Sequence, residues 1–361
     1  MKRLVFAAIA LCACTNTDTD ADSFEPWTLD DLSPSEGLSI RTPVFEVPQG
    51  TEVQDCYFFQ VPDTGDGQPL WIDRSIAAIN PGSHHMNLFR VKTIVELDPA
   101  DGRPVELGTA DAPLAGLLVE GRDPATDPCF KSANWADWPL VVNSQNSSLD
   151  NPYTDWRLPD GVAQQLAPGE MLMLQTHYVN ASSQETPQQG KVGVNLYRTA
   201  EEAPIELGTL FATQQSIRIC QSTPEVSYSG TCRFPEGTLE VAAANGHFHS
   251  RGTRFQIFAW DGVTTSEPAA ADRFYLSDTW DDPPMTTFES GLALPDAGGI
   301  YWTCDYRWTP PPVGCDVVDA RDPEGQGDCC YTFGPLVEAS EHCNVFLYYW
   351  PRVDRADIFC N

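Results

Sequence analysis

The sequence predicts an all-β protein built from two β-sandwich domains in series. Its 361 residues include 30 prolines and 26 glycines, which favour turns and short strands over long helices. Many short runs of valine, isoleucine, leucine, tyrosine and phenylalanine are typical of strands. A chain of this length is long for one compact domain and comfortable for two of roughly 150 residues each. Two sandwiches in series are therefore the economical architecture.

Three segments are the clearest strand candidates. Glu170–Val179 follows a Pro-Gly turn, and Arg254–Trp260 runs into an Asp-Gly pair, which is a hairpin signal. Cys343–Trp350 is an almost continuous apolar and aromatic run, as expected of a strand that is covered on both faces. These segments place strands in both halves of the chain.

The N-terminus resembles a bacterial lipoprotein signal. A basic start, Met1-Lys2-Arg3, precedes an apolar run over Leu4–Ala13 that is too short to span a bilayer. The small Ala13 before Cys14 suits cleavage and lipidation at Cys14, and an acidic tether follows up to residue 40. We expect an exported protein of the bacterial cell envelope, anchored at the outer membrane or cell surface only through this lipid. The alternative is a plain secretory signal with incidental cysteines.

Cysteine usage supports export and a division into two domains. Removing the signal peptide (residues 1–13) and the lipidated Cys14 leaves ten cysteines, an even number that predicts up to five disulfides. Two of the ten lie between residues 40 and 200, and eight lie beyond. A polar segment at 199–204 then suggests an N-terminal domain over 41–203 and a C-terminal domain over 204–361.

Charge and motifs exclude some functions. A formal net charge of -30 argues against a nucleic-acid partner, because phosphate binding needs clustered lysine and arginine. No Gly-x-Ser-x-Gly motif is present, so a hydrolase of that type is poorly supported.

Histidines carry the strongest functional signal. The sequence has six histidines: His84, His85, His177, His247, His249 and His342. Four of them form two close pairs, the adjacent His84 and His85 and the alternate His247 and His249. Residues i and i+2 of a strand share a face, so the second pair can converge on one ion. The adjacent first pair needs an irregular strand entrance to do the same. Flanking glycines, Gly246 and Gly252, are expected to let the backbone bend around the second pair. Imidazole suits zinc, copper, iron and nickel, so these residues predict metal sites without choosing the metal.

The histidine segments, in their order, resemble the copper type II, ascorbate-dependent monooxygenases, whose members include peptidylglycine alpha-hydroxylating monooxygenase and dopamine beta-monooxygenase. The matching segments are 83–89, 174–178, 247–252 and 341–349, with the sequences SHHMNLF, LQTHY, HFHSRG and EHCNVFLYY. Together they are spread over most of residues 50 to 361.

The resemblance implies two jelly-roll-like sandwiches that face each other across an open, solvent-filled cleft. His84, His85 and His177 would hold an electron-transfer copper in the first domain. His247 and His249 would hold an oxygen-activating copper in the second. Ascorbate or another donor would supply electrons, and a substrate C–H bond would become C–OH. The resemblance also implies the disulfides Cys304–Cys343 and Cys232–Cys360.

Several positions depart from the family pattern. His342 stands where the family has a methionine ligand at the oxygen-activating copper, so the catalytic site would consist of His247, His249 and His342. A third imidazole is harder than a thioether and favours Cu(II). Met285 is a remote candidate for the missing thioether. The arginine that holds a peptide carboxylate is replaced by Asn245, whereas Asn344, a family substrate contact, is retained.

We therefore expect a copper-dependent monooxygenase with two coppers per chain, acting on an unidentified small molecule or peptide. Peptide amidation is disfavoured because Asn245 replaces the carboxylate-binding arginine. One alternative is a copper-binding or copper-handling lipoprotein that keeps the fold without oxygenase activity. Another is a zinc protein with two three-histidine sites.

Overall fold

A computed structural model describes most of the chain. The described residues are 27–63, 67–91, 94–97, 104–108, 118–119, 129, 138–145, 148, 150–181, 187–234, 237, 239–318, 327–353 and 357–361. The predicted signal peptide, Cys14 and the first part of the tether lie outside these residues. Among the helices that the structure describes, none is long and apolar enough to cross a membrane.

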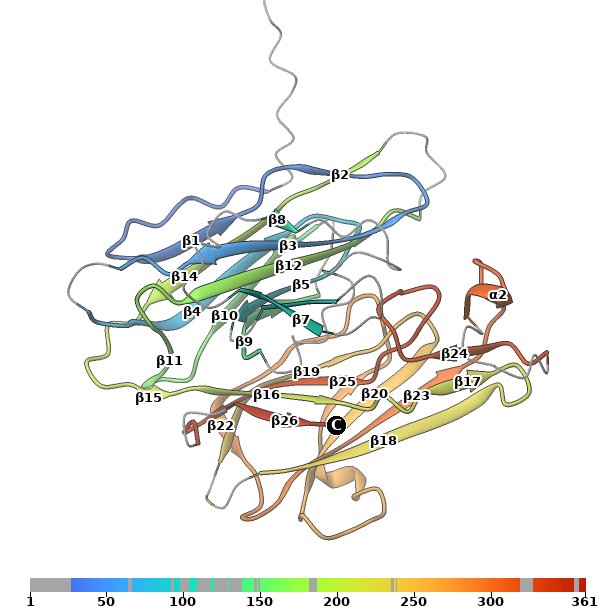
Figure 1. The fold of residues 1–361 in the computed structure, drawn as a ribbon. Coiled ribbons are helices and arrows are strands. Elements are labelled where there is room, and N and C mark those ends of the chain that lie inside the picture. Colours follow the sequence, from blue (N-terminus) through green and yellow to red (C-terminus); the bar gives the residue numbers. More distant parts are fainter. Residues whose placement is uncertain are drawn as a thin grey trace, which may run out of the picture.

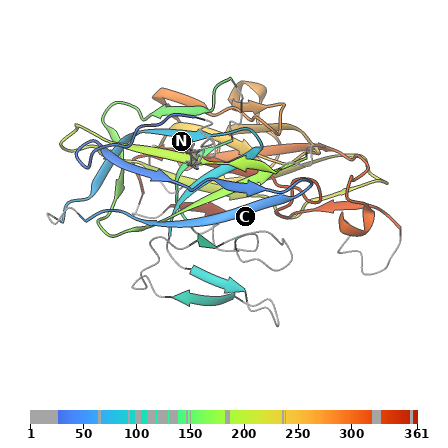
Figure 2. The ribbon, with the colours of Figure 1, turned by 90° about the horizontal axis from the view of Figure 1, so that it is seen from above.

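The first half of the chain forms a β-sandwich (Figure 1). Its strands are β1 (Gly37–Arg41), β2 (Phe45–Val47), β3 (Glu52–Gln60), β4 (Leu70–Ile79), β5 (Ser83–Arg90), β6 (Ile94–Leu97), β7 (Pro104–Gly108), β8 (Leu118–Val119), β9 (Leu140–Ser144), β10 (Tyr153–Arg157), β11 (Val162–Leu166), β12 (Met171–Val179), β13 (Gln188–Gly190), β14 (Val192–Arg198) and β15 (Ile205–Glu206). One sheet has the order β8-β3-β12-β5-β9, and the other has the order β1-β14-β4-β11-β15, with β10 also paired to β4. The β6–β7 hairpin stands apart from both sandwiches (Figure 2).

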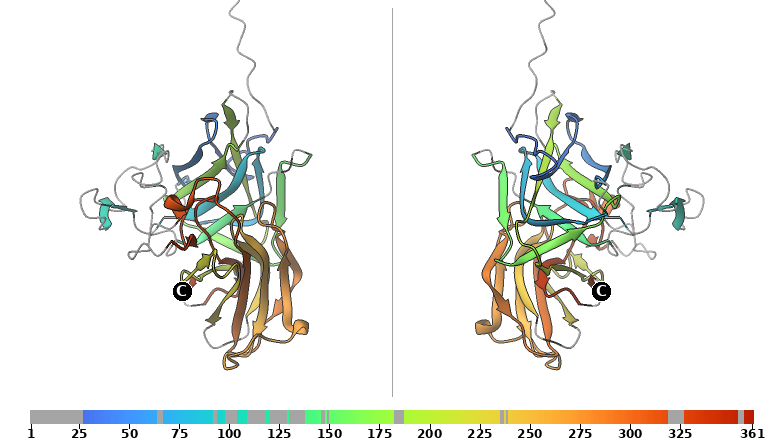
Figure 3. Two further views of the ribbon diagram at one scale, coloured as in Figure 1. Left: turned by 90° about the vertical axis from the view of Figure 1, so that its right-hand side faces the viewer. Right: turned by 90° about the vertical axis from the view of Figure 1, so that its left-hand side faces the viewer.

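A second sandwich follows. Its elements are β16 (Gly208–Thr213), β17 (Arg218–Cys220), β18 (Glu225–Arg233), β19 (Glu240–His247), β20 (Gly252–Trp260), a 3-10 turn η2 (Ala270–Asp272), β21 (Arg273–Ser277), β22 (Thr286–Ala293), β23 (Gly299–Arg307), α2 (Cys315–Val318), β24 (Cys330–Thr332), β25 (Asn344–Trp350) and β26 (Ile358–Cys360). The sheets have the orders β22-β19-β25-β16-β26 and β18-β23-β20-β21. The protein is thus all-β, with two tandem jelly-roll-like sandwiches stacked on each other (Figure 3).

The predicted strands are present. Met171–Val179, Gly252–Trp260 and Asn344–Trp350 are strands, each within two residues of the expected start. One boundary differs: Ile205–Glu206, expected in the second domain, pairs in parallel with β11 of the first. The change from one sandwich to the other therefore follows Glu206.

Strand alternation explains how the two sandwiches meet. In β12, Leu172 and Leu174 point into the core of the first sandwich, whereas Met171 and Met173 point to the opposite face. That opposite face packs against β19 and β25 of the second sandwich, for example at Phe346. Because β12 is covered on both faces, nearly all of it is buried. The same alternation places Gln175 and His177 on the face toward the second domain.

Five disulfides are formed among the described residues, which agrees with the predicted maximum. They are Cys56–Cys129, Cys220–Cys330, Cys232–Cys360, Cys304–Cys343 and Cys315–Cys329. Both pairings that the resemblance implies are among them. One bridge lies in the first domain and four in the second, as the distribution of cysteines along the chain suggested.

The two glycines that flank the second histidine pair provide room for side chains. A Cβ at Gly246 would lie 2.5 Å from the Phe255 ring, and a Cβ at Gly252 would lie 1.5 Å from the Phe248 ring. Neither glycine has a positive φ. The backbone does turn after the second pair, where the N–H of Gly252 donates to the carbonyl of His249 (2.9 Å), but it is the crowding of two buried phenylalanines that excludes a side chain at both glycines.

We expect Gly252→Ala to destabilise the protein by about 1–3 kcal/mol, the usual cost of overpacking a core. Val263→Ala is the control, because Val263 is 72% exposed and should change stability by less than about 0.5 kcal/mol. Denaturant unfolding of both variants measures the difference. Equal stabilities would contradict the packing role.

Candidate metal centre

His177 and His85 meet across neighbouring strands. His177 lies on the interface face of β12, and its register partner in β5 is His85. Cross-strand partners lie close together, so the pairing brings both imidazoles to one end of the domain interface.

His84 occupies a β-bulge. His177 pairs with His85, but the next residue, Tyr178, pairs with Ser83, which leaves His84 as the extra residue. A bulge re-aims a side chain that regular alternation would send to the opposite face. The rings of His84 and His85 consequently lie 5.1 Å apart, centroid to centroid. The predicted irregular strand entrance is confirmed.

The second pair is arranged differently from the prediction. β19 ends at His247, so His249 lies just beyond the strand rather than inside it. After the strand the backbone turns between His249 and Gly252. The buried carboxylate of Glu341 stabilises this turn by accepting hydrogen bonds from the backbone N–H groups of His249 (2.9 Å) and Arg251 (2.7 Å). The two rings still approach to 5.3 Å.

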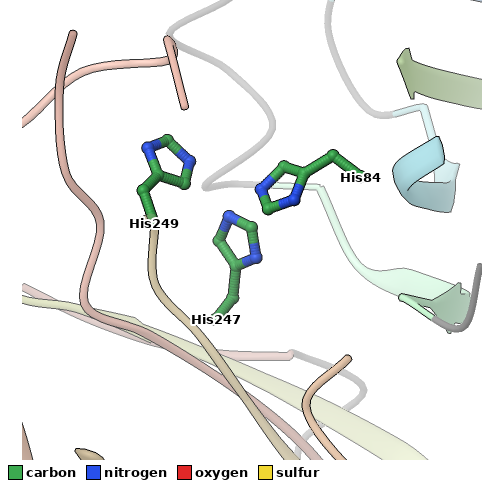
Figure 4. A group of neighbouring side chains, drawn as sticks. All are labelled: His84, His247 and His249. Atoms are coloured by element: carbon green, nitrogen blue, oxygen red, sulfur yellow. The ribbon is translucent and has the colours of Figure 1, made fainter. Parts of the chain in front are cut away.

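Histidines from both domains converge in one cluster (Figure 4). The ring of His84 lies 4.9 Å from that of His247 and 5.2 Å from that of His249, and the ring of His85 lies 5.1 Å from that of His247. All six histidines are at most 5% exposed. The open, solvent-filled cleft that the resemblance implies is therefore closed at the histidines.

Two groups of three histidines have ligand nitrogens that all lie within 4.8 Å of one another. One is the predicted set of His84, His85 and His177. The other contains His247 and His249, but its third member is His84 rather than the expected His342. His84 thus belongs to both groups and connects the two domains.

His342 lies beside the second group. Its ring is 4.3 Å from that of His249, and its Nδ1 is within hydrogen-bond distance of His247 Nε2, at 3.1 Å. The hydroxyl of Tyr306 donates to its backbone carbonyl. His342 therefore belongs to the six-histidine cluster, where it contacts His247 and His249 of the second group without being a member of that group.

Hydrogen-bond acceptors around the cluster fix the orientation of several rings. His177 Nε2 donates to Glu52 Oε1 (2.6 Å), and His249 Nδ1 donates to the carbonyl of Ser340 (3.0 Å). Gln145 Oε1 lies 2.9 Å from His247 Nδ1, and Gln175 Oε1 lies 3.3 Å from His85 Nε2. Metal-bound histidines commonly have such partners on the nitrogen that does not bind the metal.

Three buried ring nitrogens have no hydrogen-bond partner among the described residues: His84 Nε2, His85 Nδ1 and His249 Nε2. A buried polar atom without a partner costs about 1–3 kcal/mol. In His85 and His249 the opposite nitrogen is hydrogen-bonded. These unpartnered nitrogens belong to the two ligand groups, so the residues fit a metal that prefers imidazole, such as copper or zinc.

Burial also sets the charge of the cluster. It lowers the pKa of His177 and of His249 to about 3, and it lowers the pKa of the other four histidines well below the usual value, with neighbouring imidazoles adding to the effect. Neutral imidazole is the form that binds metals. Burial raises the pKa of Glu52 to about 7 and that of Glu341 to about 8.

A cavity of about 630 Å³ lies beside the cluster, between the two domains. Its lining residues are Asn143, Ser144, Gln145, Ser148, Asn151, Tyr153, Thr154, Asp155, Asn245, Asp282, Pro283, Pro284 and Met285. Met285 thus faces the cavity and belongs to neither ligand group. The predicted substrate residue Asn344 does not line this cavity: it is 1% exposed and accepts a hydrogen bond from Thr213 Oγ1.

Comparisons with known proteins give no family. No family model and no curated protein matches the chain. Among solved structures, the major capsid protein P2 from bacteriophage PM2 aligns with 86% of this chain and 97% of its own, at 9% identity and a TM-score of 0.27. PNGF-II aligns with 90% of this chain and 63% of its own, at 10% identity and a TM-score of 0.24. PNGase F, a glycosylasparaginase from Flavobacterium meningosepticum, aligns with 89% of this chain and 93% of its own, at 9% identity and a TM-score of 0.17.

Proposed function

We propose that the six-histidine cluster binds two copper ions and that the protein is a copper-dependent monooxygenase, which hydroxylates an organic substrate with oxygen and a reductant such as ascorbate. The observation that carries the metal proposal is the pair of three-histidine groups that share His84. A neutral imidazole carries a proton on one of its two nitrogens, so His84 could serve both ions only after losing that proton. The resemblance of the histidine segments to copper monooxygenases supports copper and oxygen chemistry.

The protein's own residues would orient the ligands and exclude water. Glu52 and Ser340 hold the outer nitrogens of His177 and His249, so that the remaining nitrogens point into the cluster. Glu52 also accepts a hydrogen bond from the backbone N–H of Val337 in the second domain (2.9 Å). This carboxylate therefore ties a first-domain ligand to the second domain. Copper held in the cluster would supply the one-electron chemistry that transfers electrons from the reductant to oxygen.

A second function has its own observation. The cluster consists of six imidazoles, and His342 stands where the monooxygenases have a methionine. Imidazole is a harder ligand than a thioether and favours Cu(II) over the Cu(I) state that binds oxygen. This composition favours a copper-binding or copper-handling protein that keeps the fold without oxygenase activity.

Copper loading followed by ascorbate-dependent oxygen uptake separates the two functions. The purified full chain is loaded with copper, desalted and assayed for metal content, for its electron paramagnetic resonance signal and for oxygen consumption. A monooxygenase binds two coppers and consumes oxygen only with the reductant. Two bound coppers without oxygen uptake would favour the copper-handling function, and retention of zinc against excess copper would contradict both.

We expect His249→Ala to remove one copper and to leave the group of His84, His85 and His177 filled. The reason is that His249 belongs to only one of the two groups. Metal analysis of the loaded variant measures this. Met173→Leu, a volume-conserving change at the same domain interface, is the control and should retain both coppers. Loss of both coppers from His249→Ala would contradict the division into two groups.

A further inference from the structure

The cavity beside the cluster has an unusual chemical character. Its lining includes four side-chain amides, four hydroxyls and two carboxylates: Asn143, Gln145, Asn151, Asn245; Ser144, Ser148, Tyr153, Thr154; Asp155 and Asp282. No lysine, arginine or histidine is among the described residues that line it. Its volume of about 630 Å³ lies within the range of small-molecule sites.

The first link between the cavity and the histidines is direct. Gln145 lines the cavity, and its Oε1 is hydrogen-bonded to His247 Nδ1 at 2.9 Å. Its Nε2 donates to Asn245, a second lining residue that lies two positions before His247. Gln145 is 3% exposed. A molecule in the cavity would therefore touch a side chain that orients a ligand of the second group.

A second link reaches the first group. Asn143 lines the cavity and donates through Nδ2 to Asn87 Oδ1 (2.7 Å). Asn87 in turn donates to Gln175 Oε1, which also lies 3.3 Å from His85 Nε2. Both groups of histidines are thus connected to the cavity wall through hydrogen-bonded amides.

We propose that this cavity binds the substrate and that the substrate is an uncharged small molecule rich in hydroxyl groups. That the bound molecule is a substrate rests on the proposed function, whereas the binding site itself does not. Gln145 and Asn245 already form hydrogen bonds to His247, to each other and to Pro284. The wall as a whole, with its further amides and hydroxyls, still offers both donors and acceptors, which matches hydroxyl groups that also donate and accept.

Charge argues against ionic ligands. A carboxylate would meet Asp155 and Asp282 without a lining cation to balance it. For a cationic ligand, one of the two carboxylates is already engaged, because Arg74 forms hydrogen bonds to both oxygens of Asp155, at 2.8 and 2.5 Å. A cationic ligand would therefore have Asp282 alone as its counter-charge, whereas a neutral, hydroxyl-rich ligand needs none.

Three sugars that share one ring test this inference: methyl glucoside (neutral), glucuronate (anionic) and glucosamine (cationic). Binding to the metal-free full chain is measured by saturation-transfer NMR and titration. We expect the neutral sugar to bind at least tenfold more tightly than either charged one. Tighter binding of glucuronate or glucosamine, or no binding of the neutral sugar to the folded protein, would overturn the proposal.

Two surface variants locate the site. Asn151→Trp, at an exposed lining position, fills the cavity and should abolish binding of the neutral sugar. Asp282→Arg, also exposed, reverses the charge of a lining residue and should strengthen glucuronate binding at least tenfold relative to the neutral sugar. Unchanged binding in both variants would place the sugar elsewhere and overturn the assignment. Circular dichroism confirms that each variant is folded.

Copper content, measured in parallel, separates this inference from the proposed function. Sugar binding without copper binding would leave the cavity assignment standing and overturn the proposed function. Copper binding without sugar binding would overturn the cavity assignment and leave the proposed function standing. When both bind, Cu(II) should broaden the NMR signals of the bound neutral sugar, because the cavity adjoins His247.

Discussion

The His84→Ala variant should lose both coppers, whereas single substitutions at His177 or His249 should each lose one. His84 is the histidine that belongs to both ligand groups. Its removal leaves each group with two imidazoles, and we expect the affinity of each ion to fall by more than about 100-fold, since loss of an outer partner alone costs 10–100-fold. Metal analysis after loading and desalting measures the result.

A matched control accompanies that experiment. Met173→Leu changes a buried residue at the same interface without removing a nitrogen, and it should keep both coppers. If His84→Ala retained one copper, the two groups would not share a ligand. The sites would then be separate, as the resemblance originally implied.

The Glu341→Ala variant should be strongly destabilised. Glu341 is fully buried, and its two oxygens accept the backbone N–H groups of His249 and Arg251. Removing them leaves two buried donors without partners, at a cost of about 1–3 kcal/mol each. We expect a loss of about 2–6 kcal/mol in the free energy of unfolding, measured by denaturant titration of the metal-free protein.

Glu341→Gln separates hydrogen bonding from packing in that experiment. The amide keeps the shape of the side chain and one acceptor oxygen, so this variant should lose only about half as much free energy of unfolding as the alanine variant. Equal stability of the alanine variant and the unmodified protein would show that water or a local shift satisfies both N–H groups. The bend that places His249 would then not depend on this carboxylate.

Much of the fold could be predicted because it depends on local patterns. The apolar run over Met171–Val179 and the aromatic run over Asn344–Trp350 are strands covered on both faces, as their composition indicates. The even number of cysteines predicted the five disulfides. Domain packing could not be predicted, because it depends on which faces of two distant sheets meet.

The sequence indicated that the six histidines belong together, but it did not indicate how they are arranged. Six histidines were recognised by their clustering in the sequence, but the sharing of His84 arises from a β-bulge and from the closeness of two domains. Glu52, Gln145 and Gln175 were missed because a single acidic or amide residue carries no spacing signal. Strand alternation gives only a partial clue, since Gln175 lies two residues before His177 and so shares its face.

Copper per chain, measured together with the number of unpaired spins, tests the central claim most directly. We predict two coppers per chain in the purified, loaded and desalted protein. Because the two groups share one imidazole, we also predict fewer unpaired spins than Cu(II) ions. Less than one copper per chain, or copper removed by desalting, would contradict the assignment of the six-histidine cluster as a copper centre.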